Sequence, residues 1–237
     1  MSLNEKKPVL LINGSPRKEQ SNTLVLSRAL VAGYAAQTGA PVDELTVYEM
    51  NIAPCRGCLT CWIQTPGKCV IRDDMDRAHE LMREAGLVVV SFPLYFFGMP
   101  SQLKAFLDRM VPVMRFYDGG PTVLRPHYSF DDKHFVVVST CGFRESGEIY
   151  DPLRSHIRTL FEGRADFIAV PEGEMIQEPT MRDILNKRLE ELREAGRALA
   201  LEGRIPAEEA ERLSRPLINT RAFERILKAK SNAIEHT

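Results

Sequence analysis

Short runs of apolar residues recur along the chain, and they predict buried strands. Pro8–Asn13, Leu87–Phe92, Phe135–Thr140 and Ala165–Val170 are each dominated by apolar side chains, as are strands that are covered on both faces of a sheet. Val42–Met50 alternates weakly between apolar and polar positions and is expected to form a further strand nearer a sheet edge. The pattern therefore predicts five strands.

Stretches with helical periodicity lie between these strands. In Ser21–Gln37 the apolar residues recur at near-helical spacing, and Ser21 or Asn22 is placed to cap the first turn. Asp73–Gly86 has acidic residues in its first turn and a glycine at its end, which is typical of a capped helix. Two further helices are expected over Ser101–Val113 and Asp151–Gly163.

This alternation decides the fold class. Strands that alternate with helices form a parallel sheet covered on both faces, which is the doubly wound α/β class. Five strands in a chain of 237 residues fit the flavodoxin-like order 2-1-3-4-5 better than a six-stranded dinucleotide fold. In such sheets ligands bind outside the carboxyl ends of the strands. The loops after the first, third and fourth strands are therefore the candidate site.

Beyond Pro171 the composition shifts to glutamate, arginine, leucine and alanine. Thr180–Gly203 predicts a long amphipathic helix, and two shorter helices are expected around Ala207–Leu213 and Asn219–Lys230. We expect a flavodoxin-like domain over residues 1–172 and a helical C-terminal extension over residues 173–237. The extension either packs on the same domain or forms a subunit interface.

Charge and composition exclude several classes of function. The formal net charge is −1 and no segment is rich in lysine and arginine, so we expect no binding to nucleic acid or to an anionic membrane. No apolar run approaches the roughly 20 residues that span a bilayer, and the first residues lack a signal-peptide hydrophobic region. The protein is therefore expected in the cytoplasm, where thiols stay reduced.

The loop after the first strand, NGSPRKEQSNT (Asn13–Thr23), favours binding of an anion. It joins a buried strand to a helix start, so free backbone amides, hydroxyls and a guanidinium come together there. It matches neither the Walker A pattern nor the G-x-G-x-x-G pattern, which argues against ATP hydrolysis and against a nicotinamide bound in this loop. The alternative is that Ser21 and Asn22 only cap the helix.

Four segments, in this order and spacing, resemble one known family: INGSPRKEQSNT, PCRGCLTC, CVIRDDM and FPLYFFGMPSQLKAFLDR. They are similar to the NADPH-dependent FMN reductase family, a branch of the flavodoxin-like flavoproteins, and most similar to the iron-sulfur flavoproteins within it. The resemblance covers about residues 8–170 and leaves the C-terminal residues outside. It implies a bound FMN, NAD(P)H as co-substrate and an assembly of two or four copies, because neighbouring subunits commonly complete flavin sites in this family.

The resemblance also implies which residues hold the flavin. It places the FMN phosphate on Ser15, Arg17, Ser21, Asn22 and Thr23. It places the flavin ring along Pro93, Leu94, Tyr95, Phe96 and Gly98. The loop itself offers apolar contact, backbone amides and a glycine, although its aromatic residues are equally typical of a core or an interface. Candidates for a third flavin contact after the fourth strand are Thr140, Gly142 and Phe143.

No catalytic nucleophile, acid or base is expected from the sequence. Cys141 is interpreted as a small buried residue, and none of the five histidines lies in a recognisable nucleophile motif. In a flavoenzyme the cofactor carries the chemistry, so the protein needs to supply only binding, orientation and electrostatics.

Four of the five cysteines lie close together, as Cys55, Cys58, Cys61 and Cys69. Three cysteines at two-residue intervals with a fourth farther along can ligate a [4Fe–4S] cluster, and the arrangement resembles that of the iron-sulfur flavoproteins. Such a cluster would relay electrons between FMN and an outside carrier across a subunit boundary. Two other interpretations stay open: bare thiols or a disulfide, and a zinc ion held by four thiolates.

Three functions follow from these alternatives. The first is an FMN-dependent NAD(P)H oxidoreductase that reduces a quinone, free flavin, nitroaromatic or similar small molecule. The second is an electron-transfer protein that holds FMN and a [4Fe–4S] cluster and exchanges electrons with a ferredoxin-like partner. The third is a flavin-free binding or regulatory domain that has kept the fold.

Overall fold

The computed structural model describes residues 7–116, 124–126, 133–144 and 147–235, and its centre is a parallel sheet of five strands. The strand order is β2-β1-β3-β6-β7, which confirms the predicted flavodoxin-like order. The strands are β1 (Val9–Asn13), β2 (Val42–Thr46), β3 (Leu87–Pro93), β6 (His134–Thr140) and β7 (Ala165–Val170). β2 lies at an edge, as its mixed pattern indicated.

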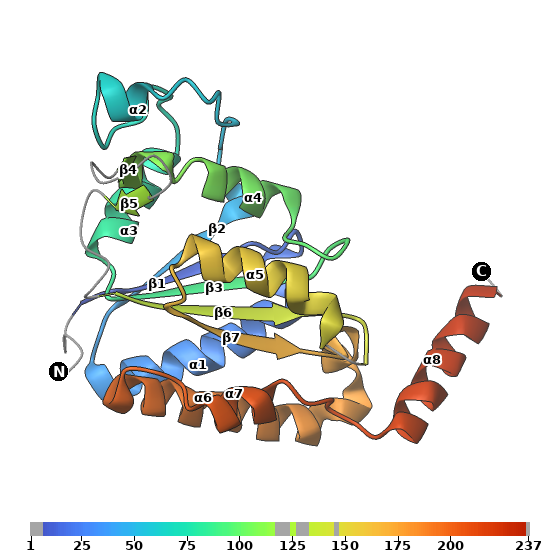
Figure 1. Cartoon of the computed structure of the whole chain (residues 1–237). Helices are drawn as coiled ribbons and strands as arrows, with labels where there is room; N and C mark the ends of the chain where they lie inside the picture. The colour runs from blue at the N-terminus through green and yellow to red at the C-terminus, as the bar shows by residue number, and fades with distance from the viewer. Residues whose placement is uncertain (1–6, 117–123, 127–132, 145–146, 236–237) are drawn as a thin grey trace.

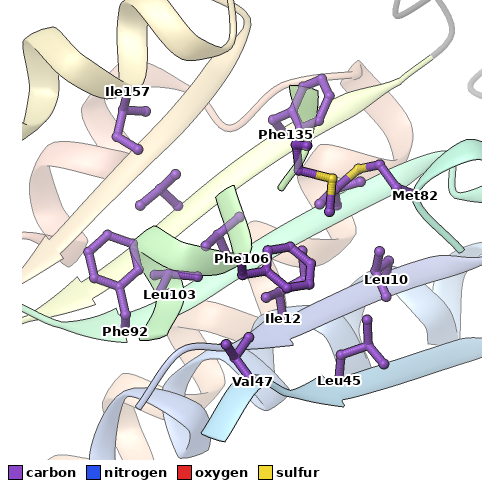
Figure 2. Packing of buried hydrophobic residues seen from close by; sticks show 14 of the residues in the cluster. Leu10, Ile12, Leu45, Val47, Met82, Phe92, Leu103, Phe106, Phe135 and Ile157 are labelled. Carbon is purple, nitrogen blue, oxygen red and sulfur yellow. The ribbon is translucent and has the colours of Figure 1, made fainter. Parts of the chain in front are cut away.

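Helices cover both faces of this sheet (Figure 1). One face carries α1 (Asn22–Thr38), α6 (Arg182–Glu202) and α7 (Ala207–Leu213). The other carries α3 (Met75–Glu84), α4 (Ser101–Asp108) and α5 (Asp151–Leu160). Figure 2 shows the core on this second face, where Leu103 and Phe106 of α4 belong to one buried cluster with Ile12 of β1 and Phe92 of β3. Two buried apolar layers therefore hold the strands in place.

Glycines let α6 approach α1 closely. A Cβ on Gly33 of α1 would lie 2.0 Å from the carbonyl oxygen of Arg193. A Cβ on Gly196 of α6 would lie 2.0 Å from the carbonyl oxygen of Leu30. The first helix of the predicted C-terminal extension thus packs directly on the helix that follows β1, whereas the domain boundary at residue 172 stays a prediction.

Two predicted elements are shorter than expected. The strand predicted over Val42–Met50 ends at Thr46, because β1, the strand with which it pairs, offers its last partner there in Asn13. The chain then forms a 3₁₀ turn over Val47–Glu49. The helix predicted over Ser101–Val113 ends at Asp108, since Pro112 has no amide hydrogen to continue it.

Three small elements were not predicted from the sequence. α2 (Thr60–Ile63) lies within the cysteine segment, and β4 (Met114–Phe116) pairs with β5 (Leu124–Pro126) in a separate antiparallel ladder. Each has only three or four residues, too few for a periodic pattern to be recognised.

The last helix, α8 (Thr220–Glu235), extends away from the sheet in Figure 1. Close to its start, Phe223 packs with Met175 and Met181 in a small buried cluster. Within the described ranges, no helix has the length and apolarity that crossing a bilayer requires.

Candidate functional site

A pocket of about 300 Å³ lies where β1, β3 and β6 end. It is lined by Ser15, Arg17, Ser21, Asn22, Thr23, Pro93, Leu94, Tyr95, Thr140, Cys141, Gly142, Gly173 and Glu174. The three loops selected from the sequence therefore meet in one place, as the topology of a doubly wound sheet requires. A fourth loop, after β7, completes the wall.

The loop after β1 is shaped by its own polar side chains. The Asn13 side-chain oxygen accepts a hydrogen bond of 3.1 Å from the Ser15 amide, and the Ser15 hydroxyl accepts one of 3.2 Å from the Arg17 amide. The Ser21 hydroxyl caps α1 by accepting from the Leu24 amide. These bonds fix the backbone without using the guanidinium of Arg17, which is exposed and forms no ion pair with any described residue.

The first turn of α1 provides donors for an anion. The amides of Asn22 and Thr23 belong to the first turn, where a helix has no carbonyl of its own to accept their hydrogen bonds. The positive end of the helix dipole points the same way. Ser21 does cap this helix, as the simpler interpretation held, but the cap uses only one of the free donors.

Asn22 is the one pocket residue whose buried side chain is incompletely bonded among the described residues. Its Nδ2 donates to the carbonyl oxygen of Gly173 at 2.6 Å, whereas its Oδ1 is buried without a partner in that part of the chain. A buried acceptor without a donor costs free energy unless a ligand satisfies it. A ligand that carries hydroxyl groups beside its anionic end fits this position.

Threonine and glycine join the pocket loops to one another. The hydroxyls of Thr23 and Thr140 lie 2.6 Å apart, which links α1 to the end of β6. The Gly173 amide donates to the Cys141 carbonyl at 2.7 Å. A Cβ on Gly173 would lie 2.6 Å from the Cβ of Thr140, so only glycine allows this approach. The pocket wall is thus built from close backbone contacts.

The loop after β3 ends in a strained aromatic turn. Tyr95 and Gly98 exchange two backbone hydrogen bonds of 2.9 Å, and both residues between them have positive φ, 46° at Phe96 and 62° at Phe97. Phe96 is 99% exposed, and the ring of Phe97 stacks on that of Phe143 with centroids 6.0 Å apart. Bulky residues rarely adopt this conformation, and such strain is concentrated at functional sites.

Not every residue predicted for the flavin lines the pocket. Phe96, Gly98 and Phe143 are absent from its wall; they belong to the exposed aromatic turn or stack on it. Cys141 does line the pocket but is 4% exposed, and burial raises the pKa of its thiol, which fits a small packed residue rather than a nucleophile.

Two further wall residues, Gly173 and Glu174, were missed from the sequence. They follow β7 at its carboxyl end, the same end at which the other loops were selected. The segment PEGE at residues 171–174, with a proline and a glycine within three residues of the end of a buried strand, was the available signal.

The four clustered cysteines lie elsewhere and surround a cavity of about 50 Å³. Cys55 and Cys58 are exposed, Cys61 is buried, Cys69 is half-buried, and all are free thiols, so no disulfide joins them. Burial raises the pKa of the Cys61 thiol, and the charges of Cys69 and Cys58 raise it further. Among the described residues no three potential ligands converge as they would around a single metal ion.

The inner wall of this cavity is held by a buried ion pair. Arg109, directly after α4, donates to both carboxylate oxygens of Asp73, at 2.6 and 2.9 Å. Burial disfavours the Asp73 carboxylate, but Arg109 and the amides of Ala53 and Met75 outweigh it and keep the pKa of Asp73 below its ordinary value. The ion pair therefore holds Ala53, which precedes the first of the four cysteines, close to Asp73, which follows the last.

Comparison with known proteins gives the same fold. A family model described as a flavodoxin-like fold matches residues 7–197, which reaches into α6. An iron-sulfur flavoprotein from Methanosarcina thermophila is 34% identical over 137 residues, covering 58% of this chain and 64% of that protein. The chain thus spans less than two thirds of that relative. The resemblance that the four sequence segments indicated is confirmed.

Two more relatives carry FMN in their names. An FMN-dependent NADH:quinone oxidoreductase from Pseudomonas fluorescens is 26% identical over 180 residues, 71% of this chain and 85% of that protein. The crystal structure of an FMN-dependent NADH-azoreductase from Bacillus anthracis, in complex with FMN, has a TM-score of 0.60 and 17% identity, covering 82% of this chain and 99% of that one. At this identity the structural likeness shows the fold alone.

Proposed function

The chain belongs to the flavodoxin-like fold family, and on that premise we propose that it binds FMN in the pocket at the ends of β1, β3 and β6. It uses NADH or NADPH to reduce a small acceptor such as a quinone or free flavin. The name of the quinone oxidoreductase relative supports this reaction.

One observation carries the proposal: the pocket has a polar end and an aromatic end. Arg17, the hydroxyls of the first loop and the start of α1 form the polar end, whereas Pro93, Leu94 and Tyr95 form the other. FMN has the same polarity, because a phosphate and a hydroxylated chain precede a flat apolar ring. The unpartnered Oδ1 of Asn22 offers an acceptor for the hydroxyl groups of that chain.

The residues of the chain bind and orient the cofactor. The Arg17 guanidinium and the amides of Asn22 and Thr23 hold the phosphate by charge-assisted hydrogen bonds. The loop after β3 places backbone amides and the Tyr95 side chain beside the ring. Bound there, FMN supplies the chemistry of hydride acceptance and of one- or two-electron donation. The protein needs no catalytic acid or base of its own for this reaction.

Comparison of FMN with riboflavin tests the proposal, since the two differ by the phosphate alone. We expect the protein to bind FMN at least about tenfold more tightly than riboflavin, measured by quenching of flavin fluorescence. Arg17→Ala should weaken FMN about tenfold and leave riboflavin unchanged. Arg28→Ala is the matched control, because Arg28 is also exposed but pairs with Glu19 and Glu44 outside the pocket.

The outcomes separate the candidate functions. Oxidation of NADH or NADPH with a panel of quinones, flavins and nitroaromatics should be detectable only when FMN is bound. A protein that stays colourless and takes up no added FMN would support the flavin-free domain and refute the proposal. Binding of FMN without turnover of any acceptor would refute the enzymatic part alone.

A [4Fe–4S] cluster is the second candidate, favoured by the four free thiols around one cavity. The donor set fits: thiolates ligate such clusters, and a cubane spreads its ligands over four irons, so three of them need not converge on one point. The present 50 Å³ has room for only one or two waters, so the exposed segment with Cys55 and Cys58 must move outward to admit a cluster. A zinc ion, which requires convergent ligands, fits less well.

The two sites share no lining residue and lie apart on the molecule, with α2 far from the heads of β6 and β7 in Figure 1. A cluster would supply one-electron transfer, but not directly to the flavin pocket of the same copy. We therefore infer a dimer or tetramer in which a second copy brings the cysteine cavity near the flavin, with a ferredoxin-like protein as the outside carrier.

Anaerobic purification tests the cluster. About four irons and four sulfides per chain, with a broad shoulder near ~400 nm beside the flavin peaks, are expected. Replacement of Cys61 by serine should abolish iron uptake, while Cys141→Ser, which changes a thiol outside the cavity, should not. If the wild-type protein takes up no iron after anaerobic reconstitution with iron and sulfide, the cluster is excluded, and the proposal that the protein binds FMN is not affected.

A further inference from the structure

Arg109 is the most deeply buried cation beside the cysteines. Its relative exposure is 1%, and it lines the same cavity as Cys61 and Cys69. A fully buried guanidinium is costly unless its charge and all its donors are used. The acceptors of its five N–H donors therefore indicate which groups the cavity brings to this charge.

Four hydrogen bonds account for the two terminal nitrogens of this guanidinium. Nη1 donates to the Ala53 carbonyl at 2.7 Å and to Asp73 at 2.6 Å. Nη2 donates to the Ile71 carbonyl at 3.3 Å and to Asp73 at 2.9 Å. Both carbonyls belong to the chain on either side of the cysteines, so Arg109 joins the beginning and the end of that segment.

The remaining donor, Nε, is buried and has no partner among the described residues. Cys69 is the neighbouring group that can use it. Cys69 lines the same cavity, and it lies two residues before Ile71, whose carbonyl oxygen accepts a hydrogen bond from Nη2 of the same guanidinium. The unused donor and the shared cavity point to the same atom, the sulfur of that residue.

We propose that Arg109 is the positioning residue of the cysteine cavity, which keeps its Nε–H for the sulfur of Cys69 and places a fixed positive charge beside a thiolate-ligated cluster. This inference rests on the cluster proposed above. Arg109 acts through the ligand rather than on the iron. This role also explains why a charged side chain is buried here, where an apolar side chain of similar volume would cost less free energy.

Two consequences follow from charge and hydrogen bonding. Hydrogen bonds to the sulfurs and nearby charge set the reduction potential of iron–sulfur clusters, and reduction adds a negative charge that a fixed cation stabilises. Loss of Arg109 therefore lowers the potential. It also loosens the Cys69 ligand, since partners behind a metal ligand commonly contribute a factor of 10 to 100 in metal affinity.

The test compares Arg109→Gln and Arg109→Lys with the wild-type protein, each as the full chain reconstituted anaerobically. Arg188→Gln is the matched control, because Arg188 is also buried, at 8% exposure, but donates to the Leu213 carbonyl far from the thiols. The measured quantities are the cluster potential from a redox titration followed by electron paramagnetic resonance, the rate of iron loss to a chelator, and FMN content as a check on folding.

We expect Arg109→Gln to lower the potential and to speed iron loss about tenfold or more. Arg109→Lys keeps the positive charge but loses the planar guanidinium with its several donors. Its cluster potential should stay close to that of the wild-type protein, whereas iron should still be lost faster. Arg188→Gln should change neither quantity. An Arg109→Gln variant that retains FMN and matches the wild-type potential and iron loss would overturn this inference alone, whereas a wild-type chain without iron would overturn it together with the cluster proposal.

Discussion

Arg144 and Glu172 form an ion pair that joins the loops around the pocket at the strand ends to the C-terminal part of the chain. Glu172 is fully buried, and its carboxylate also accepts hydrogen bonds from the amides of Leu217, at 2.6 Å, and Ile218, at 3.0 Å. Its own amide donates to the Phe143 carbonyl at 2.9 Å. One residue thus joins the loop after β6, the loop after β7 and the segment that leads into α8.

Replacement of Glu172 by glutamine should therefore destabilise the protein and disturb the pocket. Glutamine has nearly the same shape as glutamate but leaves Arg144 without its buried negative partner. We expect the free energy of unfolding, measured with urea, to fall by about 2–3 kcal/mol. FMN affinity should fall as well. Glu190→Gln, which removes an exposed pair with Arg193 and Arg197, is the control and should leave the free energy of unfolding close to that of the wild-type protein. Equal losses in the two variants would contradict this role.

The close approach of α1 and α6 gives a second prediction, in which the sign of the effect is the test. In a free helix, Gly196→Ala would stabilise by about 1 kcal/mol. Here the new Cβ meets backbone at 2.0 Å, so we expect a net loss of about 1–3 kcal/mol in unfolding free energy. Gly147→Ala, where no atom of the described residues lies within 4 Å of the added Cβ, is the control. A stabilised Gly196→Ala variant would show that the helices are not in contact as described.

The strands and most of the pocket could be predicted because local patterns determine them. Val9–Asn13 and Leu87–Pro93 are buried on both faces, and such strands have continuous apolar runs that are visible in the sequence. Once strands and helices alternate, the parallel topology brings the loops after β1, β3 and β6 to one edge. The residues Thr23 and Thr140 are 117 positions apart, yet the topology alone predicts that the loops to which they belong meet.

The rest depends on contacts that no local pattern reveals. Arg109 stands at the end of an amphipathic helix, where an arginine is usually exposed, and only its pairing with Asp73, 36 positions away, buries it. The turn at Phe96 and Phe97 has aromatic residues where left-handed backbone normally requires glycine or asparagine. Such departures from local preference are expected at functional or strained positions.

The buried histidine of α3 predicts a pH dependence of stability. Burial lowers the pKa of His79 and outweighs the opposing effect of the hydrogen bond, 2.8 Å long, between its Nε2 and the Arg109 carbonyl oxygen. The charges of Arg109 and Arg83 also lower the pKa, whereas Asp76 raises it. Because the unfolded chain then binds more protons than the native one in mild acid, stability is fully present above the ordinary histidine pKa of about 6.5 and falls as pH decreases below it.

His79→Gln should reduce this dependence. Glutamine can still donate to the Arg109 carbonyl but does not titrate, so the loss of unfolding free energy between pH 7.5 and pH 5.5 should be smaller than in the wild-type protein. Urea unfolding at the two values measures it. His156→Gln, on α5, where the side chain is exposed, serves as the comparison and should leave the wild-type slope unchanged. A His79→Gln variant with the full wild-type slope would assign the acid sensitivity to other groups.

The strained turn at Phe96 predicts opposite effects on stability and activity. Phe96 is 99% exposed with φ of 46°, so Phe96→Gly relieves backbone strain while it loses almost no burial. We expect the unfolding free energy to rise by roughly 1 kcal/mol. If the turn holds its aromatic rings beside the pocket for an incoming acceptor, kcat/KM for a quinone should fall while FMN affinity is kept. Glu162→Gly relieves a similar φ of 53° after α5, away from the pocket, and should raise stability without changing kinetics. If Phe96→Gly also raises stability without changing kcat/KM, the strained turn has no role in the reaction. Strain that serves a function persists because its relief reduces activity.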